Sequence, residues 1–165
     1  MASRLSDRLR VRGYIGFTIR DAKTGRVLRR YEDRNTITYL GLTSLVYLWS
    51  QRVADAAPAT FKVTELHVST GNTAPTPADT DLATPGSAVV LALIDASKTV
   101  TVSNPTFELR LAATLGAGQG NGLTFCEAGV FLANGNMAAR QIHPNIVKTG
   151  AIVIDYDWRL DLVAA

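Results

Sequence analysis

The sequence predicts one mainly β domain, an antiparallel β-sandwich or jelly-roll-like fold that carries a single helix. Three observations support this prediction. Apolar and polar residues alternate with a period of two along much of the chain, Gly- and Pro-containing turns separate these runs about every ten residues, and only one segment has helical spacing. With 165 residues, the chain fits a single domain. We therefore treat residues 1–165 as one β-rich domain, in which residues 1–34 form a basic N-terminal arm or hairpin.

The first predicted element is this basic hairpin. Ile15, Phe17 and Ile19 alternate with polar residues, so residues 11–20 are expected to form a half-buried strand. A turn-rich pentapeptide that ends in Gly25 follows, and residues 26–31 are the expected returning strand. Residues 1–34 carry ten Arg or Lys and four acidic residues, whereas the rest of the chain carries seven and ten. The basic segment is therefore expected to contact a partner through Arg4, Arg8, Arg10, Arg12, Arg29 and Arg30.

One amphipathic helix is predicted near residues 36–51. Apolar and small residues from Ile37 to Leu48 recur at spacings of three and four, which is the pattern of a helix with one buried face. Asn35 and Thr36 are expected to cap this helix, because their side chains can accept hydrogen bonds from its free N–H groups.

The remainder of the chain is predicted to form strands. The uniformly apolar residues 88–94 are typical of a strand that is buried on both faces. A long polar loop, residues 70–86, precedes it, and ordered loops of this length are often contact elements. In the last strand, apolar residues such as Trp158 face one way and charged residues such as Asp157 face the other. The further predicted strands are residues 61–69, 99–103, 106–115, 123–132 and 136–142, the last two joined by a turn with Asn134 and Gly135 at its tip.

Motifs of enzyme chemistry are weak in this sequence. His67 and His143 have no acidic or Cys partner at a metal-binding spacing and are expected at the surface or at strand ends. Cys126 is flanked by Glu127, but adjacent strand residues face opposite sides, so the acid is badly placed to activate the thiol. The glycine-rich residues 116–122 lack the Lys-Ser/Thr and the following helix of a phosphate-binding loop. We therefore expect no catalytic residue and no cofactor.

Other acidic clusters and the apolar runs narrow the function further. Asp79 and Asp81 offer oxygen ligands for Ca²⁺ but lack the rest of an EF-hand pattern, so no metal site is predicted. The longest apolar run, residues 88–94, spans seven residues, whereas a membrane helix needs roughly 20. No membrane partner is therefore expected.

An ion pair is predicted between Glu127 and Arg140. Glu127 interrupts an apolar strand, and a buried acid is costly unless it is paired. Glu127 and Arg140 lie at similar distances from the turn at Gly135, which places them on neighbouring strands of one hairpin.

An ordered series of short motifs resembles one class of proteins. The series contains an N-x-I-T-x-x-G-L opening at 35–42, an L-x-x-x-T-G-x-x-A-P-x-x-x-D-T-x-L signature at 66–82 and E-A-G-V-F at 127–131. M-A-A-R at 137–140, P-N-I-V-K-T at 144–149 and Y-D-W at 156–158 complete it. This arrangement resembles small structural virion proteins of tailed bacteriophages, of the head-accessory or decoration type or of the tail-fibre or collar type.

The resemblance implies a function without catalysis. It implies a β-rich subunit that acts as a homo-oligomer or docks on other virion proteins, made in the host cytoplasm and located in the virion. The absence of a repetitive shaft favours a compact capsid decoration or head-accessory subunit over a tail, collar or fibre-attachment subunit. A nucleic-acid-binding module that uses the basic segment is the alternative from another class, although aromatic residues do not interleave with these arginines.

Overall fold

Nine strands and one α-helix make up the part of the chain that the computed structural model describes, namely residues 9–50, 62–93, 99–103 and 106–164. The elements are β1 (Leu9–Asp21), β2 (Val27–Ile37), α1 (Tyr39–Ser50), β3 (Val63–Ser69), β4 (Val89–Ala92), β5 (Thr99–Ser103), β6 (Thr106–Leu115), β7 (Thr124–Leu132), β8 (Met137–Val147) and β9 (Ile152–Ala164). A short 3₁₀ helix, Pro85–Ser87, precedes β4.

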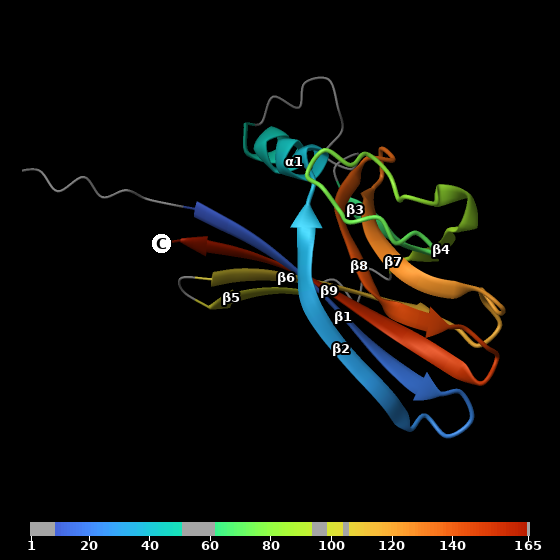
Figure 1. The fold of residues 1–165 in the computed structure, drawn as a ribbon. Helices are drawn as coiled ribbons and strands as arrows, with labels where there is room; N and C mark the ends of the chain where they lie inside the picture. Colours follow the sequence, from blue (N-terminus) through green and yellow to red (C-terminus); the bar gives the residue numbers. More distant parts are fainter. Residues whose placement is uncertain (1–8, 51–61, 94–98, 104–105, 165) are drawn as a thin grey trace, which may run out of the picture.

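The strands form two layers that are joined at one corner (Figure 1). Their order is β4-β3-β7-β8-β2-β1-β9-β6-β5, and the strand pairs whose register is given are all antiparallel. The joint is narrow, because β2 meets β8 only through Thr36 opposite Arg140 and Ile37 opposite Ala139. We call β2, β1, β9, β6 and β5 the first layer, and β8, β7, β3 and β4 the second layer.

The core lies between these two layers. The first layer contributes alternate residues of its central strands, including Phe17 and Trp158, and both are buried. The second layer contributes residues such as Leu66, Phe125 and Val130, which are fully buried in the same cluster. Two sheets that bury alternate residues against each other form a β-sandwich. The predicted mainly β, antiparallel sandwich with one helix is therefore confirmed.

Two predicted hairpins are present, and both extend beyond the predicted strands. The turn between β1 and β2 contains Gly25 at φ +70°, and the turn between β7 and β8 contains Gly135 at φ +84°. Strand β8 continues past its expected end at Ile142 to Val147. Pro144 is tolerated there because the pairing of β7 with β8 is shifted between Phe125 and Glu127, so the ladder is already interrupted.

The start of the helix differs from the prediction. Asn35 and Thr36 were expected to cap it, but they continue β2, where Thr36 pairs with Arg140. Thr38 is the actual cap, since its hydroxyl oxygen accepts a hydrogen bond from the N–H of Gly41 at 3.0 Å. The same hydroxyl donates to the carbonyl of Met137, which ties the helix start to β8.

The apolar segment at residues 88–94 was predicted to be buried on both faces, and this prediction is wrong. Residues 89–92 form β4, which is the end strand of the sheet order and pairs with β3. Only alternate residues point inwards there: Leu91 is buried, whereas Val90 is half exposed. Ile94 lies outside the described residues.

Candidate functional site

A buried cluster of charged side chains joins the 70–86 loop to the second layer. Arg140 of β8 and Glu127 of β7 are almost completely buried, and the Arg140 Nε donates to a carboxylate oxygen of Glu127. The Nη1 of Arg140 donates to Asp79, and its Nη2 donates to the carbonyl oxygen of Thr73 at 2.8 Å. The structure thus brings together the two residues of the predicted ion pair and adds a second acid from the loop.

Glu127 holds both ends of the same loop. Its Oε2 accepts a hydrogen bond from the Ser69 hydroxyl at the end of β3, and its Oε1 accepts one from the backbone N–H of Ala83 at 2.9 Å. Gly71 lies against this carboxylate, and a Cβ at Gly71 would stand 2.4 Å from the Glu127 Oε2. A residue without a side chain is therefore required at position 71. We call the group Ser69, Gly71, Asp79, Glu127 and Arg140 the loop clamp.

Asp79 is held by the loop itself as well as by Arg140. The Thr76 N–H donates to one carboxylate oxygen at 2.9 Å, and the Thr76 hydroxyl donates to the other at 2.7 Å. Burial acts to raise the pKa of Asp79, but the bonds from Thr76 and the charge of Arg140 outweigh it and hold that pKa below its ordinary value. Asp79 is therefore a charged partner of Arg140. The second acid of the calcium hypothesis, Asp81, accepts a bond from the N–H of Leu82.

The chemistry of the loop clamp is structural. Each carboxylate oxygen of Glu127 and Asp79 accepts a hydrogen bond, and Arg140 donates from three nitrogens. Fully engaged buried charges fix a conformation and leave no free acid or base for proton transfer. Within the described residues, no group of three or more His, Cys, Asp or Glu side chains is arranged to hold a metal ion.

Cys126 belongs to the surroundings of the loop clamp. Its thiol donates to the carbonyl oxygens of Thr70 and Gly71, both at 3.1 Å, and burial together with the nearby charge of Glu127 raises the pKa of the thiol. Cys126 and Glu127 were expected on opposite faces of the strand because they are adjacent in sequence. That expectation is wrong, because the pairing shift in β7 lets both side chains reach the 69–83 segment. A thiol with a raised pKa is a poor nucleophile.

The two histidines have different environments. His67 lies 2.9 Å from a carboxylate oxygen of Glu65 and stacks on the ring of Phe131. His143 was expected at the surface or at a strand end, but it is buried between the layers, with its ring 5.2 Å from Phe17 and 6.0 Å from Tyr156. Burial lowers the pKa of His143 and favours its neutral form. Its Nε2 makes no hydrogen bond within the described residues.

Lys148 is a charged residue whose burial the sequence did not predict. Its ammonium group donates to the carbonyl oxygens of Ala117 and Thr149 and to the side-chain oxygen of Asn121, at 2.9 to 3.2 Å. Burial lowers its pKa. In the sequence, Lys148 lies two residues after Ile146 on the same alternation and belongs to the P-N-I-V-K-T motif at 144–149, but neither feature indicates a buried charge. Lys148 of the segment after β8 therefore holds the glycine-rich 116–122 connection in place through its hydrogen bonds to Ala117 and Asn121.

The basic N-terminal segment lies beside acidic residues of the last strand. Strand β1 pairs with β9 along its whole length, and Arg20 forms an ion pair with Asp155 at 2.6 Å. Arg159 of β9 lies 4.1 Å from the centre of the Tyr14 ring and 3.4 Å from Asp161. The alternation of the last strand places Asp161 on the same charged face as Asp157, where solvent exposure was expected, but Asp161 is buried against Arg159. The positive charge of the N-terminal segment is therefore partly compensated in the folded chain by acidic residues of β9.

Several of the proposed contact arginines remain available. Arg10, Arg12, Arg29 and Arg30 are exposed and form no ion pair among the described residues. Arg29 and Arg30 are adjacent in β2 and so face opposite sides of the first layer. The remaining two contact residues of the prediction, Arg4 and Arg8, lie outside the described residues.

The fold defines a class, an antiparallel β-sandwich whose long loop is held by buried ion pairs. Comparison with known proteins does not narrow this class: no family model, no curated protein and no solved structure matches the chain. Among the described residues, the helix is too short to span a lipid bilayer.

Proposed function

We propose that this chain is a non-enzymatic structural subunit of a tailed-phage particle, in the form of a compact capsid decoration or head-accessory subunit that binds neighbouring virion proteins. One observation carries the proposal. The residues of the loop clamp come from separate motifs of the series that resembles phage virion proteins: Gly71 and Asp79 from the second, Glu127 from the third and Arg140 from the fourth.

The convergence of these motifs gives them a shared physical role. A series of short matches spread over a long stretch of sequence would be uninformative if the matched residues served unrelated purposes. Here they meet in one buried cluster that fixes the 70–86 loop on a rigid scaffold. A rigid loop loses little conformational entropy when it docks, which suits a subunit that binds a particle surface. The proposal therefore assigns the clamped loop to contact with a neighbouring protein.

A particle-binding experiment tests this proposal. Purified, fluorescently labelled chain is added to particles of the encoding phage that lack the corresponding gene, and bound protein is measured after sedimentation. We expect saturable binding. In a parallel experiment the chain is labelled with gold, and electron microscopy is expected to show the gold on the head of the particle. Saturable binding with gold at the tail, collar or fibre base would replace the head assignment by the alternative position. A folded protein that binds no part of the particle would overturn the proposal.

The exposed arginines support nucleic-acid binding as the alternative function. In the described residues, Arg10, Arg12, Arg29 and Arg30 are not neutralised by ion pairs, so phosphate groups could reach them. Glu32 and Asp33 of β2 and Asp157 of the neighbouring β9 lie near them, however, and would repel a phosphate backbone. Binding of duplex or single-stranded DNA that falls steeply with salt, and that is lost when these arginines are replaced by glutamine, would favour this alternative.

A further inference from the structure

The outward face of the first layer carries two adjacent rows of residues with opposite character. Strand register places Glu32, Gly16 and Asp157 side by side in one row across β2, β1 and β9. The next row, two residues along each strand, contains Arg34, Tyr14 and Arg159. The rows lie roughly 7 Å apart, because a strand rises about 3.4 Å per residue.

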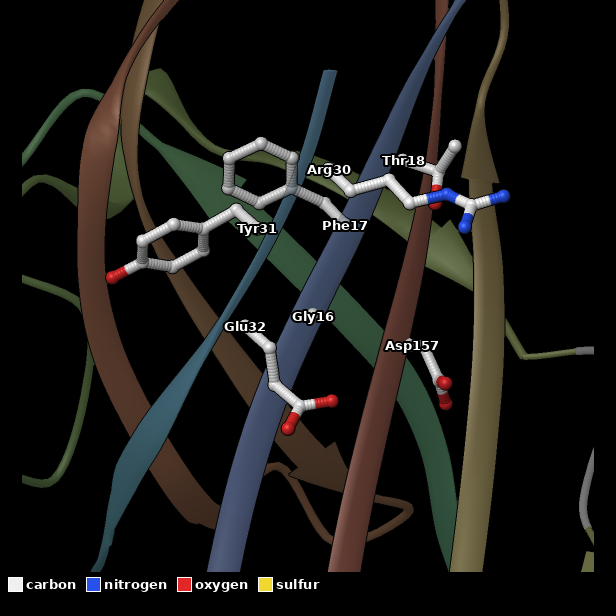
Figure 2. A pocket seen from close by; sticks show the side chains of 7 residues that line it. All are labelled: Gly16, Phe17, Thr18, Arg30, Tyr31, Glu32 and Asp157. Atoms are coloured by element: carbon white, nitrogen blue, oxygen red, sulfur yellow. The ribbon is translucent and has the colours of Figure 1, made fainter. Parts of the chain in front are cut away.

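Gly16 produces a depression in the first of these rows. An open hollow with a volume of about 440 Å³ is lined by Gly16, Phe17, Thr18, Arg30, Tyr31, Glu32 and Asp157. Figure 2 shows Glu32 and Asp157 on either side of Gly16, and the Arg30 side chain reaching over β1 towards Thr18.

The backbone explains a glycine at position 16 only in part: a Cβ there would stand 3.3 Å from the backbone carbonyl oxygen of Tyr31, a tight contact that a shift of a few tenths of an ångström would relieve. The residue is not among the glycines with positive φ, and the pairing shift of β1 lies further along, at Ile19 and Arg20. Glycine in the middle of a strand weakens the strand and often marks a place where another chain approaches closely. The hollow over Gly16 is therefore a candidate contact point.

Tyr14 is suited to fill such a hollow. It stands on the same face of β1, one row away from Gly16, and its ring is held over the Arg159 guanidinium at 4.1 Å. An aromatic ring fixed in this way loses little side-chain entropy on binding. Arg34 and Glu32 stand next to Tyr14 and Gly16, and neither forms an ion pair among the described residues.

We infer that this face binds a second copy of the same chain through a two-fold axis that lies in the face and runs across the strands between the two rows. Rotation about this axis exchanges the rows, so that Tyr14 of each copy enters the hollow over Gly16 of the other. The same rotation places Arg34 opposite Glu32 and Arg159 opposite Asp157, and each contact occurs twice, as a closed dimer requires. The contact faces of the two copies are therefore complementary in shape, through the Tyr14 ring and the hollow, and in charge, through the arginine and acid pairs.

The flanking rows are compatible with this arrangement. Asp155 of one copy would face Asp161 of the other, but each already has an arginine partner in its own chain, Arg20 at 2.6 Å and Arg159 at 3.4 Å. Arg12 of one copy would stand opposite Thr18 of the other, next to Asp155, where its positive charge is favourable. Sheet twist separates the outermost rows, so the two central rows dominate the contact.

A charge-swap experiment tests the dimer. The oligomeric mass of the full chain is measured by sedimentation velocity over a range of concentrations at low salt. Wild type is expected to be a dimer, and Glu32→Arg and Arg34→Glu are each expected to weaken it at least about 10-fold, because like charges then face each other across the axis. The double variant restores the opposite pairing and is expected to recover the dimer. Arg26→Glu, with the same charge change near the hairpin turn, is the control and is expected to leave it intact.

Cross-linking gives a second and independent readout. In a Cys126→Ala background, Tyr14→Cys and Gly16→Cys are prepared separately and mixed under mild oxidation. The mixed pair is expected to form a disulfide-linked dimer faster than either variant alone. A folded wild type that stays monomeric at high concentration, single charge variants that dimerise like wild type, or a double variant that stays monomeric would overturn the inference. None of these results depends on a phage particle, so the dimer and the proposed function can fail separately.

Discussion

Arg140 offers the sharpest test of the loop clamp. In an Arg140→Met variant the methionine keeps most of the volume of the side chain but removes the charge. Glu127, which has no solvent exposure, then loses its cationic partner. Breaking a buried ion pair in this way costs about 3 to 5 kcal/mol, because the remaining charge cannot be solvated. The remaining bonds from Ser69 and Ala83 place the expected loss towards the lower end of that range.

Urea unfolding measures this loss. With an m value of about 2 kcal/mol/M, the unfolding midpoint of Arg140→Met is expected to fall by roughly 1.5 to 2 M. Hydrogen exchange adds a local readout, since amide protons of the 70–86 loop are expected to exchange faster once Asp79 and Thr73 lose Arg140. Asp79→Asn is the matched control. Its side chain is partly solvated, so it is expected to cost only about 1 kcal/mol.

A double variant separates loss of the ion pair from loss of packing. Glu127→Gln combined with Arg140→Met removes both buried charges and is expected to recover much of the stability that Arg140→Met alone loses. If Arg140→Met unfolds within about 1 kcal/mol of wild type, the buried ion pair does not hold the loop and the reasoning is refuted.

Three further predictions follow from buried groups. The lowered pKa of His143 means that the unfolded chain binds the additional proton below about pH 6.5, so the free energy of unfolding should fall with decreasing pH by up to about 1.4 kcal/mol per pH unit. His143→Phe should lose this part of the dependence in urea titrations between pH 5 and 8; identical pH profiles would contradict it. Gly71→Ala should destabilise the protein by about 1 to 3 kcal/mol in the same assay, because the new methyl group overlaps Glu127, and an unchanged midpoint would show that the loop adapts. Thr38→Ala should cost about 1 to 2 kcal/mol by removing the cap of α1 and the donor to Met137, measurable as a lower thermal midpoint; retention of the wild-type midpoint would exclude this role.

The sequence was sufficient to predict most of the sandwich. Strands with one buried face leave a period-two pattern, and residues such as Ile15 and Tyr156 are buried where that pattern placed them. The Glu127–Arg140 pair was also accessible, because both residues belong to one hairpin and can be counted from its turn. A contact within one hairpin can be predicted without knowing how the other strands are arranged.

Features that depend on distant neighbours were not accessible. Asp79 and Ser69 join the loop clamp across 61 and 58 residues of sequence, and no local pattern shows that they meet Arg140 and Glu127 there. The apolar segment around Val90 looks like a central strand, although its place at the end of the sheet is set by the order of all nine strands. His143 is buried because β8 continues through Pro144, a residue that usually ends a strand.

The helix start was mispredicted for a related reason. Asn35 and Thr36 are good capping residues, yet β2 continues through them because Thr36 pairs with Arg140 at the corner between the layers. Asn35 also lies against Gly13 of the neighbouring strand. Tertiary pairing here overrides a local preference, which is weak by comparison. The helix then begins with the next capping residue, Thr38.

Quantitative mass spectrometry of purified particles tests the central claim most directly. The proposal requires that a tailed phage encodes this chain; particles of that phage are purified to constant density, and the copy number of the chain is measured relative to the major capsid protein. The proposed structural role predicts a fixed copy number that matches the symmetry of its attachment site and persists through high-salt washing. A chain that is abundant in infected cells but absent from washed particles would contradict the assignment.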